Sequence, residues 1–247
     1  MPKNLVFGQA GGGNKWDAIV DFMSYSTSEF EERIDLFLNA TKQYVFMSSA
    51  RVYANMDFAK INENMPRILE VTYDKDYLLT DEYALSKARQ ENLLIGHNKK
   101  NYTIIRPYIT YNYNRLQLGI YEKEQWLLRA LNKKPIVFSK DIANKITTMT
   151  YAGDVSYLIS ELLGRKNALG ETFNITSGET LKWKEVLQIY ITSIEEFYGI
   201  HPVVIYKDNA VVPKHQFYQY KYDRMYNRIF DNNKILDTIF KKGYKML

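Results

Sequence analysis

Three side chains in this sequence could carry out acid–base chemistry together: Ser49, Tyr83 and Lys87. If Tyr83 and Lys87 lie on one helix, their four-residue spacing places the phenol and the ammonium on the same face. A nearby cation favours the phenolate, which brings a group with an ordinary pKa of about 10 closer to use at neutral pH. The set therefore predicts a phenol that can donate a proton to a bound ligand or accept one from it.

Strands and one helix must bring these side chains together. Residues 43–48 form a short apolar run that stops in small polar residues, which predicts a buried strand ending next to Ser49. The helix that carries Tyr83 should continue to about Ile95 and end at Gly96. Residues 102–105 predict another strand, closed by Arg106 and Pro107. Because open α/β sheets bind ligands at the ends of their strands, we expect the site at this edge.

The surrounding segments predict an α/β unit. A strand at 18–23, a helix at 28–41 and the strand at 43–48 form a strand–helix–strand unit, whose right-handed crossover makes the two strands parallel neighbours. The long connection at 54–80 is expected to form the wall of a cleft without a helix of its own. Further elements are expected as strands at 135–138, 145–151, 171–175 and 203–206, and as helices at 152–163, at 182–198 and after residue 230.

Composition limits the classes of protein. The 247 residues, 46% hydrophobic and 25% charged, predict one sizeable globular α/β domain, or one domain with a small appended lobe. The lack of Cys excludes disulfides and thiolate zinc sites, and the three His residues are scattered, so we expect no metal. No apolar run approaches the roughly 20 residues of a membrane span, and no signal peptide is evident. We therefore expect a cytoplasmic protein that does not associate with a membrane.

Net charge favours an anionic ligand. A formal charge of +5 and a pI near 9.0 suit a small molecule such as a nucleotide diphosphate, and would suit nucleic acid as well. The basic residues are mostly dispersed along the chain, which favours the small molecule and makes nucleic acid the weaker expectation.

The ordered motifs carry a family resemblance. SSARVY at 48–53, YALSK at 83–87 and IIRP at 104–107 together resemble the extended short-chain dehydrogenases/reductases, specifically the NAD-dependent epimerase/dehydratase branch that acts on nucleotide sugars. The resemblance extends from about Trp16 to the C-terminus. It implies a truncated Rossmann-like parallel sheet with helices on both faces and a small C-terminal substrate lobe. It also implies that Ser49, Tyr83 and Lys87 are the catalytic set.

The resemblance implies a division of the chain. Residues 1–15 would be an irregular segment or remnant strand, and 16–180 an incomplete Rossmann-like core with insertions of the substrate lobe from about residue 108. Residues 181–247 would be mainly the C-terminal substrate lobe.

The family's N-terminal dinucleotide-binding half is mostly missing. Gly8 to Gly13 superficially resembles a phosphate-binding glycine loop, but the next strand follows directly, where the family has a helix, two strands and another helix. A parallel crossover needs a dozen or more residues, so residues 4–7 either pair antiparallel with 18–23 or stay outside the sheet. The open sheet edge should then be covered by a partner chain, by a second copy of this chain or by a loop.

Ligand contacts follow from the resemblance. For NAD or NADP it implies Phe22, Met23, Ser48, Tyr83, Lys87 and Pro107, and for a nucleotide-sugar substrate Ser49, Arg51, Arg115 and Lys145. The cofactor would exchange a hydride with the sugar while the tyrosine transfers the proton and the serine orients the reacting oxygen. The chain departs from the family at three positions, because Ile109, Asn112 and Thr147 stand where Asn, Gly and Arg are usual.

Three functions stay open at this point. The retained catalytic residues favour an NAD(P)-dependent epimerase, dehydratase or reductase. The missing half favours a catalytically silent binding or subunit-interaction module, because losing the pyrophosphate cradle should cost several factors of ten in cofactor affinity, to the point of weak or absent binding. RNA binding through the basic surface is the third alternative.

Overall fold

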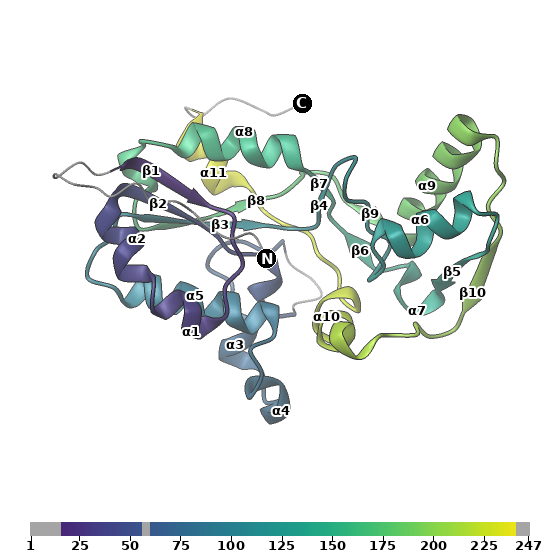
Figure 1. The fold of residues 1–247 in the computed structure, drawn as a ribbon, viewed down its shortest axis with the longest axis horizontal. Helices are drawn as coiled ribbons and strands as arrows, with labels where there is room; N and C mark the ends of the chain where they lie inside the picture. Colours follow the sequence, from purple (N-terminus) through teal and green to yellow (C-terminus); the bar gives the residue numbers. More distant parts are fainter. Residues whose placement is uncertain (1–15, 56–59, 241–247) are drawn as a thin grey trace.

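The protein is divided into a sheet domain and a smaller lobe (Figure 1). A computed structural model describes residues 16–55 and 60–240 of the chain. The glycine-rich segment at 8–13 and the strand expected at 4–7 lie outside the described residues. Of the helices in the described ranges, none is long and apolar enough to cross a membrane.

Four parallel strands form the sheet. Their order is β1–β2–β3–β8, with bounds Trp16–Asp21, Thr41–Met47, Tyr102–Pro107 and Glu171–Ile175. The register pairs Val20 with Val45, Phe46 with Ile104, and Ile105 with Phe173. The prediction that the first two strands are parallel neighbours is confirmed.

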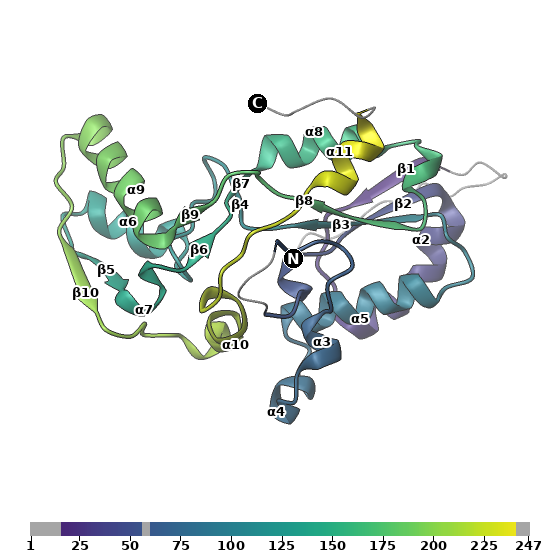
Figure 2. The same cartoon turned by 180° about the vertical axis from the view of Figure 1, so that it is seen from behind.

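Helices cover both faces of the sheet (Figures 1 and 2). Successive side chains of a strand point to opposite faces, so Tyr44 and Phe46 pack on one side while Val45 packs on the other. The first face is covered by α1 (Thr27–Glu31), α2 (Ile34–Ala40) and α5 (Tyr83–Gly96), and the second by α8 (Ala152–Leu162) and α11 (Asn233–Ile239). The predicted Rossmann-like α/β class is thereby confirmed.

Three details of the prediction are wrong. The helix expected at 28–41 is broken into α1 and α2, and α1 starts from a capping box formed by Ser26 and Glu29. The connection at 54–80 contains two short helices, α3 (Ile68–Val71) and α4 (Lys75–Leu78). The strand expected at 145–151 is two separate strands, β6 (Ile146–Thr147) and β7 (Thr150–Tyr151).

The lobe has its own apolar core, which includes Trp126, Trp183 and Phe138. Its remaining elements are β4 (Thr110–Tyr111), α6 (Lys123–Leu131), β5 (Ile136–Ser139), α7 (Lys140–Ala143), β9 (Leu181–Lys182), α9 (Trp183–Tyr198), β10 (Val204–Lys207) and α10 (Phe217–Gln219). From the lobe the chain returns to the sheet, where Ile235 of α11 packs in the same core as Val45 and Ile105.

Candidate functional site

A cavity of about 320 Å³ lies at the carboxyl ends of β2 and β3, where the lobe meets the sheet domain. Five residues predicted from the sequence line it: Ser49, Arg51, Tyr83, Pro107 and Arg115. The sequence reasoning did not find Gln117, Glu122, Gln219 and Arg224, which line it as well. The cavity therefore combines two of the three predicted catalytic side chains with several cations.

Ser49 is held in place by the turn that it begins. It follows β2 and caps the 3₁₀ turn Ala50–Val52, accepting a hydrogen bond at Oγ from the Arg51 amide at 3.2 Å. Its neighbour Ser48, predicted to contact the cofactor, donates its hydroxyl to the buried carboxylate of Glu91 at 2.5 Å. Adjacent residues in extended backbone point to opposite sides, so only the second serine reaches the cavity.

Tyr83 is the first residue of α5, and 41% of its surface is exposed. Glu82 caps this helix by accepting the Ala84 amide at 2.8 Å, and a second donor, the hydroxyl of Tyr77, lies 2.9 Å from the same oxygen. The phenol is thus presented at the start of a capped helix, with one side toward solvent. A hydroxyl in this position can exchange a proton with a ligand in the cavity.

Lys87 lies one helical turn farther along and is buried, with 3% exposure. Its Nζ atom is 4.6 Å from the centroid of the Phe46 ring. Burial lowers the pKa of this ammonium to about 8, against the opposing effect of Asp21 and Glu91. Among the described residues no hydrogen bond joins Ser49, Tyr83 and Lys87, and the lysine is not part of the cavity lining.

Replacing Lys87 by methionine should stabilise the fold at neutral pH. The folded pKa of about 8 lies below the value of about 10.4 expected in the unfolded chain, so the unfolded state binds more protons between the two and stability rises with pH there. Below about pH 8 the buried charge costs up to about 3 kcal/mol. Urea unfolding between about pH 7 and 10.5 measures this, and we expect the gap between Lys87→Met and wild type to close as pH rises. Parallel curves would contradict the assignment.

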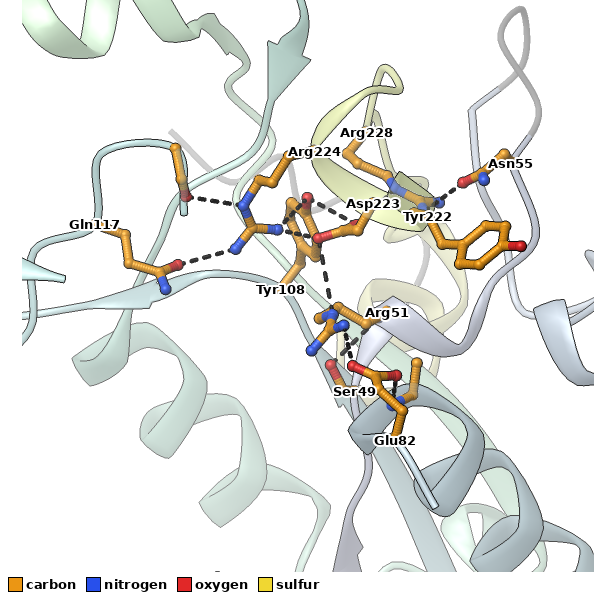
Figure 3. Close-up of polar contacts among 12 residues, drawn as sticks. Ser49, Arg51, Asn55, Glu82, Tyr108, Gln117, Tyr222, Asp223, Arg224 and Arg228 are labelled. Carbon is orange, nitrogen blue, oxygen red and sulfur yellow. Dashed lines mark hydrogen bonds and ion pairs between the residues drawn. The ribbon is translucent and has the colours of Figure 1, made fainter. Parts of the chain in front are cut away.

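A buried ionic cluster borders the cavity on the side of the lobe (Figure 3). Asp223 accepts hydrogen bonds from Arg228 Nε at 2.8 Å and from the Tyr108 hydroxyl at 3.1 Å, and it forms an ion pair with Arg224. Arg51 Nε lies 3.9 Å from the same carboxylate. Burial acts to raise the pKa of Asp223, but the three guanidinium groups prevail and lower it.

Arg224 connects this cluster to the cavity. It is 2% exposed and donates to the Gly119 carbonyl at 2.9 Å and to Gln117 Oε1 at 3.1 Å. The residue ends a π-helical turn, Tyr220–Arg224, a geometry that is frequent at functional sites. Both of these acceptors lie more than a hundred positions away along the chain, so no local pattern indicates the contacts.

The other predicted contacts lie apart from the cavity. Phe22 and Met23 follow β1 and are 66% and 44% exposed. Lys145 is half-buried outside the cavity lining, and its carbonyl accepts the Trp183 amide. Thr147 is buried, and its hydroxyl has no hydrogen-bond partner. In the described ranges no three His, Asp or Glu side chains form a group that could hold a metal ion.

Comparison with known proteins gives likenesses in structure only. No family model and no curated protein sequence matches the chain. A dTDP-glucose 4,6-dehydratase from Bacillus anthracis, solved in complex with NAD, superposes with a TM-score of 0.64 at 16% identity over 93% of this chain and 68% of its own. For a UDP-glucuronic acid 4-epimerase from Bacillus cereus, also in complex with NAD, the values are 0.61, 17%, 88% and 60%.

A third solved structure belongs to the same group. A short-chain dehydrogenase/reductase superfamily protein from Agrobacterium tumefaciens, with bound NAD, has a TM-score of 0.60 at 17% identity, over 93% of this chain and 75% of its own. The chain thus spans between 60% and 75% of these three proteins. It has the fold of the short-chain dehydrogenases/reductases, as its motifs predict.

Proposed function

We propose that the protein catalyses an oxidoreductive step on a nucleotide sugar, as an epimerase, dehydratase or reductase, with NAD or NADP as the hydride carrier. The observation that supports this most directly is that Ser49 and Tyr83 line one cavity at the carboxyl ends of β2 and β3. Strand ends of this kind are where open α/β sheets bind ligands. The NAD bound by the solved structures of the same fold agrees with this choice of cofactor.

The residues present fit the nicotinamide end of such a cofactor. The Lys87 ammonium makes no hydrogen bond among the described residues and lies outside the cavity lining, so it would contact ribose hydroxyls of a cofactor that extends beyond this cavity. Pro107 ends β3 and, like Tyr83, lines the cavity. When bound, the cofactor would give or take the hydride. The protein's part is then to hold the sugar hydroxyl against Ser49 and to move its proton through the phenol of Tyr83.

The charges around the cavity suit a diphosphate. Within residues 16–55 and 60–240, Arg51, Arg224 and Arg228 pair with two carboxylates, Asp223 and Glu82, which leaves one positive charge in this cluster without a paired carboxylate among those residues. Arg115, at the open side of the cavity, pairs with Glu122 at 3.2 Å and can exchange that partner for a phosphate oxygen. An anionic substrate would complete the electrostatics of the site.

A silent binding module is the second candidate, and two observations favour it. Lys87 does not reach the cavity lining. In the described part of the chain β1 is an edge strand, with Trp16 and Phe22 64% and 66% exposed near its ends, so a partner chain could cover this edge. Such a module would keep the fold without turnover.

Cofactor titration separates the two candidates. We expect NAD⁺ or NADP⁺ to bind the full chain saturably, with a Kd in the range of about 1 to 100 μM by calorimetry. Turnover is then sought with UDP- and dTDP-sugars, by absorbance of the reduced nicotinamide and by NMR of the products. If neither NAD⁺ nor NADP⁺ binds at a concentration of about 1 mM, the proposal is overturned and the silent module is favoured.

A further inference from the structure

Arg51 contacts both of the candidate catalytic residues in the cavity. Its backbone amide donates to Ser49 Oγ at 3.2 Å, which fixes that hydroxyl. Its guanidinium carbon lies 5.3 Å from the centroid of the Tyr83 ring, over the ring face. A planar cation in this position is attracted to the ring and restricts the orientations that the ring can adopt.

The same guanidinium group also binds Glu82, the residue that precedes α5. Nη2 donates to Glu82 Oε1 at 2.6 Å, and both side chains are largely buried, with 13% and 15% exposure. Glu82 uses its other oxygen to cap α5 through the Ala84 amide. Arg51 therefore holds the carboxylate that determines where α5 begins, one residue before Tyr83.

A third contact reaches the lobe. Arg51 Nε faces Asp223 Oδ2 at 3.9 Å, too far for a hydrogen bond, and this buried nitrogen has no hydrogen-bond partner. One side chain thus spans the end of β2, the start of α5 and the π-helical turn of the lobe (Figure 3). The guanidinium is therefore directed at groups of the protein itself.

We propose that Arg51 is a positioning residue for Ser49 and Tyr83, and that it does not act mainly as the substrate contact predicted from the sequence. The guanidinium group fixes the orientation of the Tyr83 ring through the contact with its face, and the start of α5 through the hydrogen bond to Glu82. The negative charge of Asp223 orients the guanidinium from the lobe. The kinetic part of this inference rests on the proposed function, whereas the structural part does not.

A spectroscopic test needs no turnover. Tyr83 of the full chain is replaced by 3-fluorotyrosine, which gives one ¹⁹F resonance from this ring, and Arg51→Met and Arg51→Lys are compared in that background. We expect Arg51→Met to move and broaden the resonance, because the ring loses the cation on its face. Arg51→Lys should do so less, because a single ammonium keeps the charge but cannot form the fork. Arg165→Met removes the same charge from a surface pair with Glu161 and should leave the resonance unchanged.

A kinetic test separates positioning from substrate binding. In an active enzyme Arg51→Met should lower kcat by about 10²-fold, because misplacing a reacting group by about 1 Å costs that much. KM for the nucleotide sugar should stay within about twofold of wild type. A raised KM with unchanged kcat would make Arg51 a substrate contact and overturn the inference.

The two proposals fail in different ways. If the wild type binds no cofactor and turns over no sugar, the proposed function fails, but the ¹⁹F comparison still decides the placement of the ring. If the resonance is the same in Arg51→Met and wild type, the positioning role is refuted whatever the activity. Thermal unfolding of each variant confirms that the spectra come from folded protein, and Arg51→Lys serves if the methionine variant does not fold.

Discussion

Tyr83→Phe should reduce turnover of a nucleotide sugar by about 10²- to 10⁴-fold, the usual contribution of a positioned acid–base group. The change removes one oxygen and keeps the ring, so the contact with the Arg51 guanidinium is retained. Because Tyr83 is the first residue of α5 and 41% exposed, its hydroxyl adds little to packing. The loss should therefore appear in kcat, with cofactor affinity nearly unchanged.

Steady-state kinetics and cofactor titration on the same protein preparations measure both quantities. Tyr157→Phe is the matched control, since Tyr157 lies on α8 with 54% exposure and does not line the cavity. Turnover of Tyr83→Phe within about threefold of wild type would exclude the phenol as the proton-transfer group. An equal loss in the control variant would indicate instead that both changes act through folding.

Apolar runs and the turn-forming residues that bound them were enough to predict where the strands of the sheet lie. Residues 172–176 alternate polar and apolar side chains, and β8 has the bounds Glu171–Ile175 that the sequence predicts. The helix that begins at Tyr83 also ends where expected, at Gly96. These elements are local in origin, because each bound depends on the residues immediately around it.

Polar side chains at the strand ends were harder to assign. Ser48 and Ser49 are adjacent, and the resemblance assigns the first to the cofactor and the second to the substrate, whereas in the structure Ser49 alone of the two lines the cavity. The difference depends on Glu91, which lies inside the fold beside Arg106 and Arg67 and takes the hydroxyl of the first serine. Burial of that carboxylate is a property of the packed sheet domain and leaves no local signal.

On the lobe side of the site the sequence predicted Arg115, which lines the cavity, but not Asp223 and Arg224. Asp223 and Arg224 lie in a stretch without helical or strand periodicity, which folds as a π-helical turn. Their partners Tyr108 and Gln117 come from the opposite end of the lobe's sequence. The only available signal was an acid flanked by cations in an aromatic segment, and such a group is more often a solvated surface.

Asp223→Asn should lower the free energy of unfolding by about 3–5 kcal/mol, because removing one partner of a buried ionic group leaves the others uncompensated. The replacement has nearly the same shape, so the loss measures charge, and Arg224 and Arg228 are the groups that lose it, each about 1% exposed in its side chain. Urea unfolding followed by tryptophan fluorescence suits this measurement, since Trp183 is buried in the lobe beside Arg224.

The pH dependence gives the same prediction a second test. The neighbouring arginines lower the pKa of Asp223, so its stabilisation is complete above the unfolded value of about 3.9 and is lost as pH falls through the folded value. The gap between wild type and Asp223→Asn should therefore be constant near neutrality and shrink in acid.

Asp208→Asn, which breaks only the exposed pair with Lys140, should change stability by less than about 1 kcal/mol. A comparable loss in both variants would mean that Asp223 stabilises the lobe no more than a surface carboxylate does, and that the arginines around the cavity are neutralised by other groups.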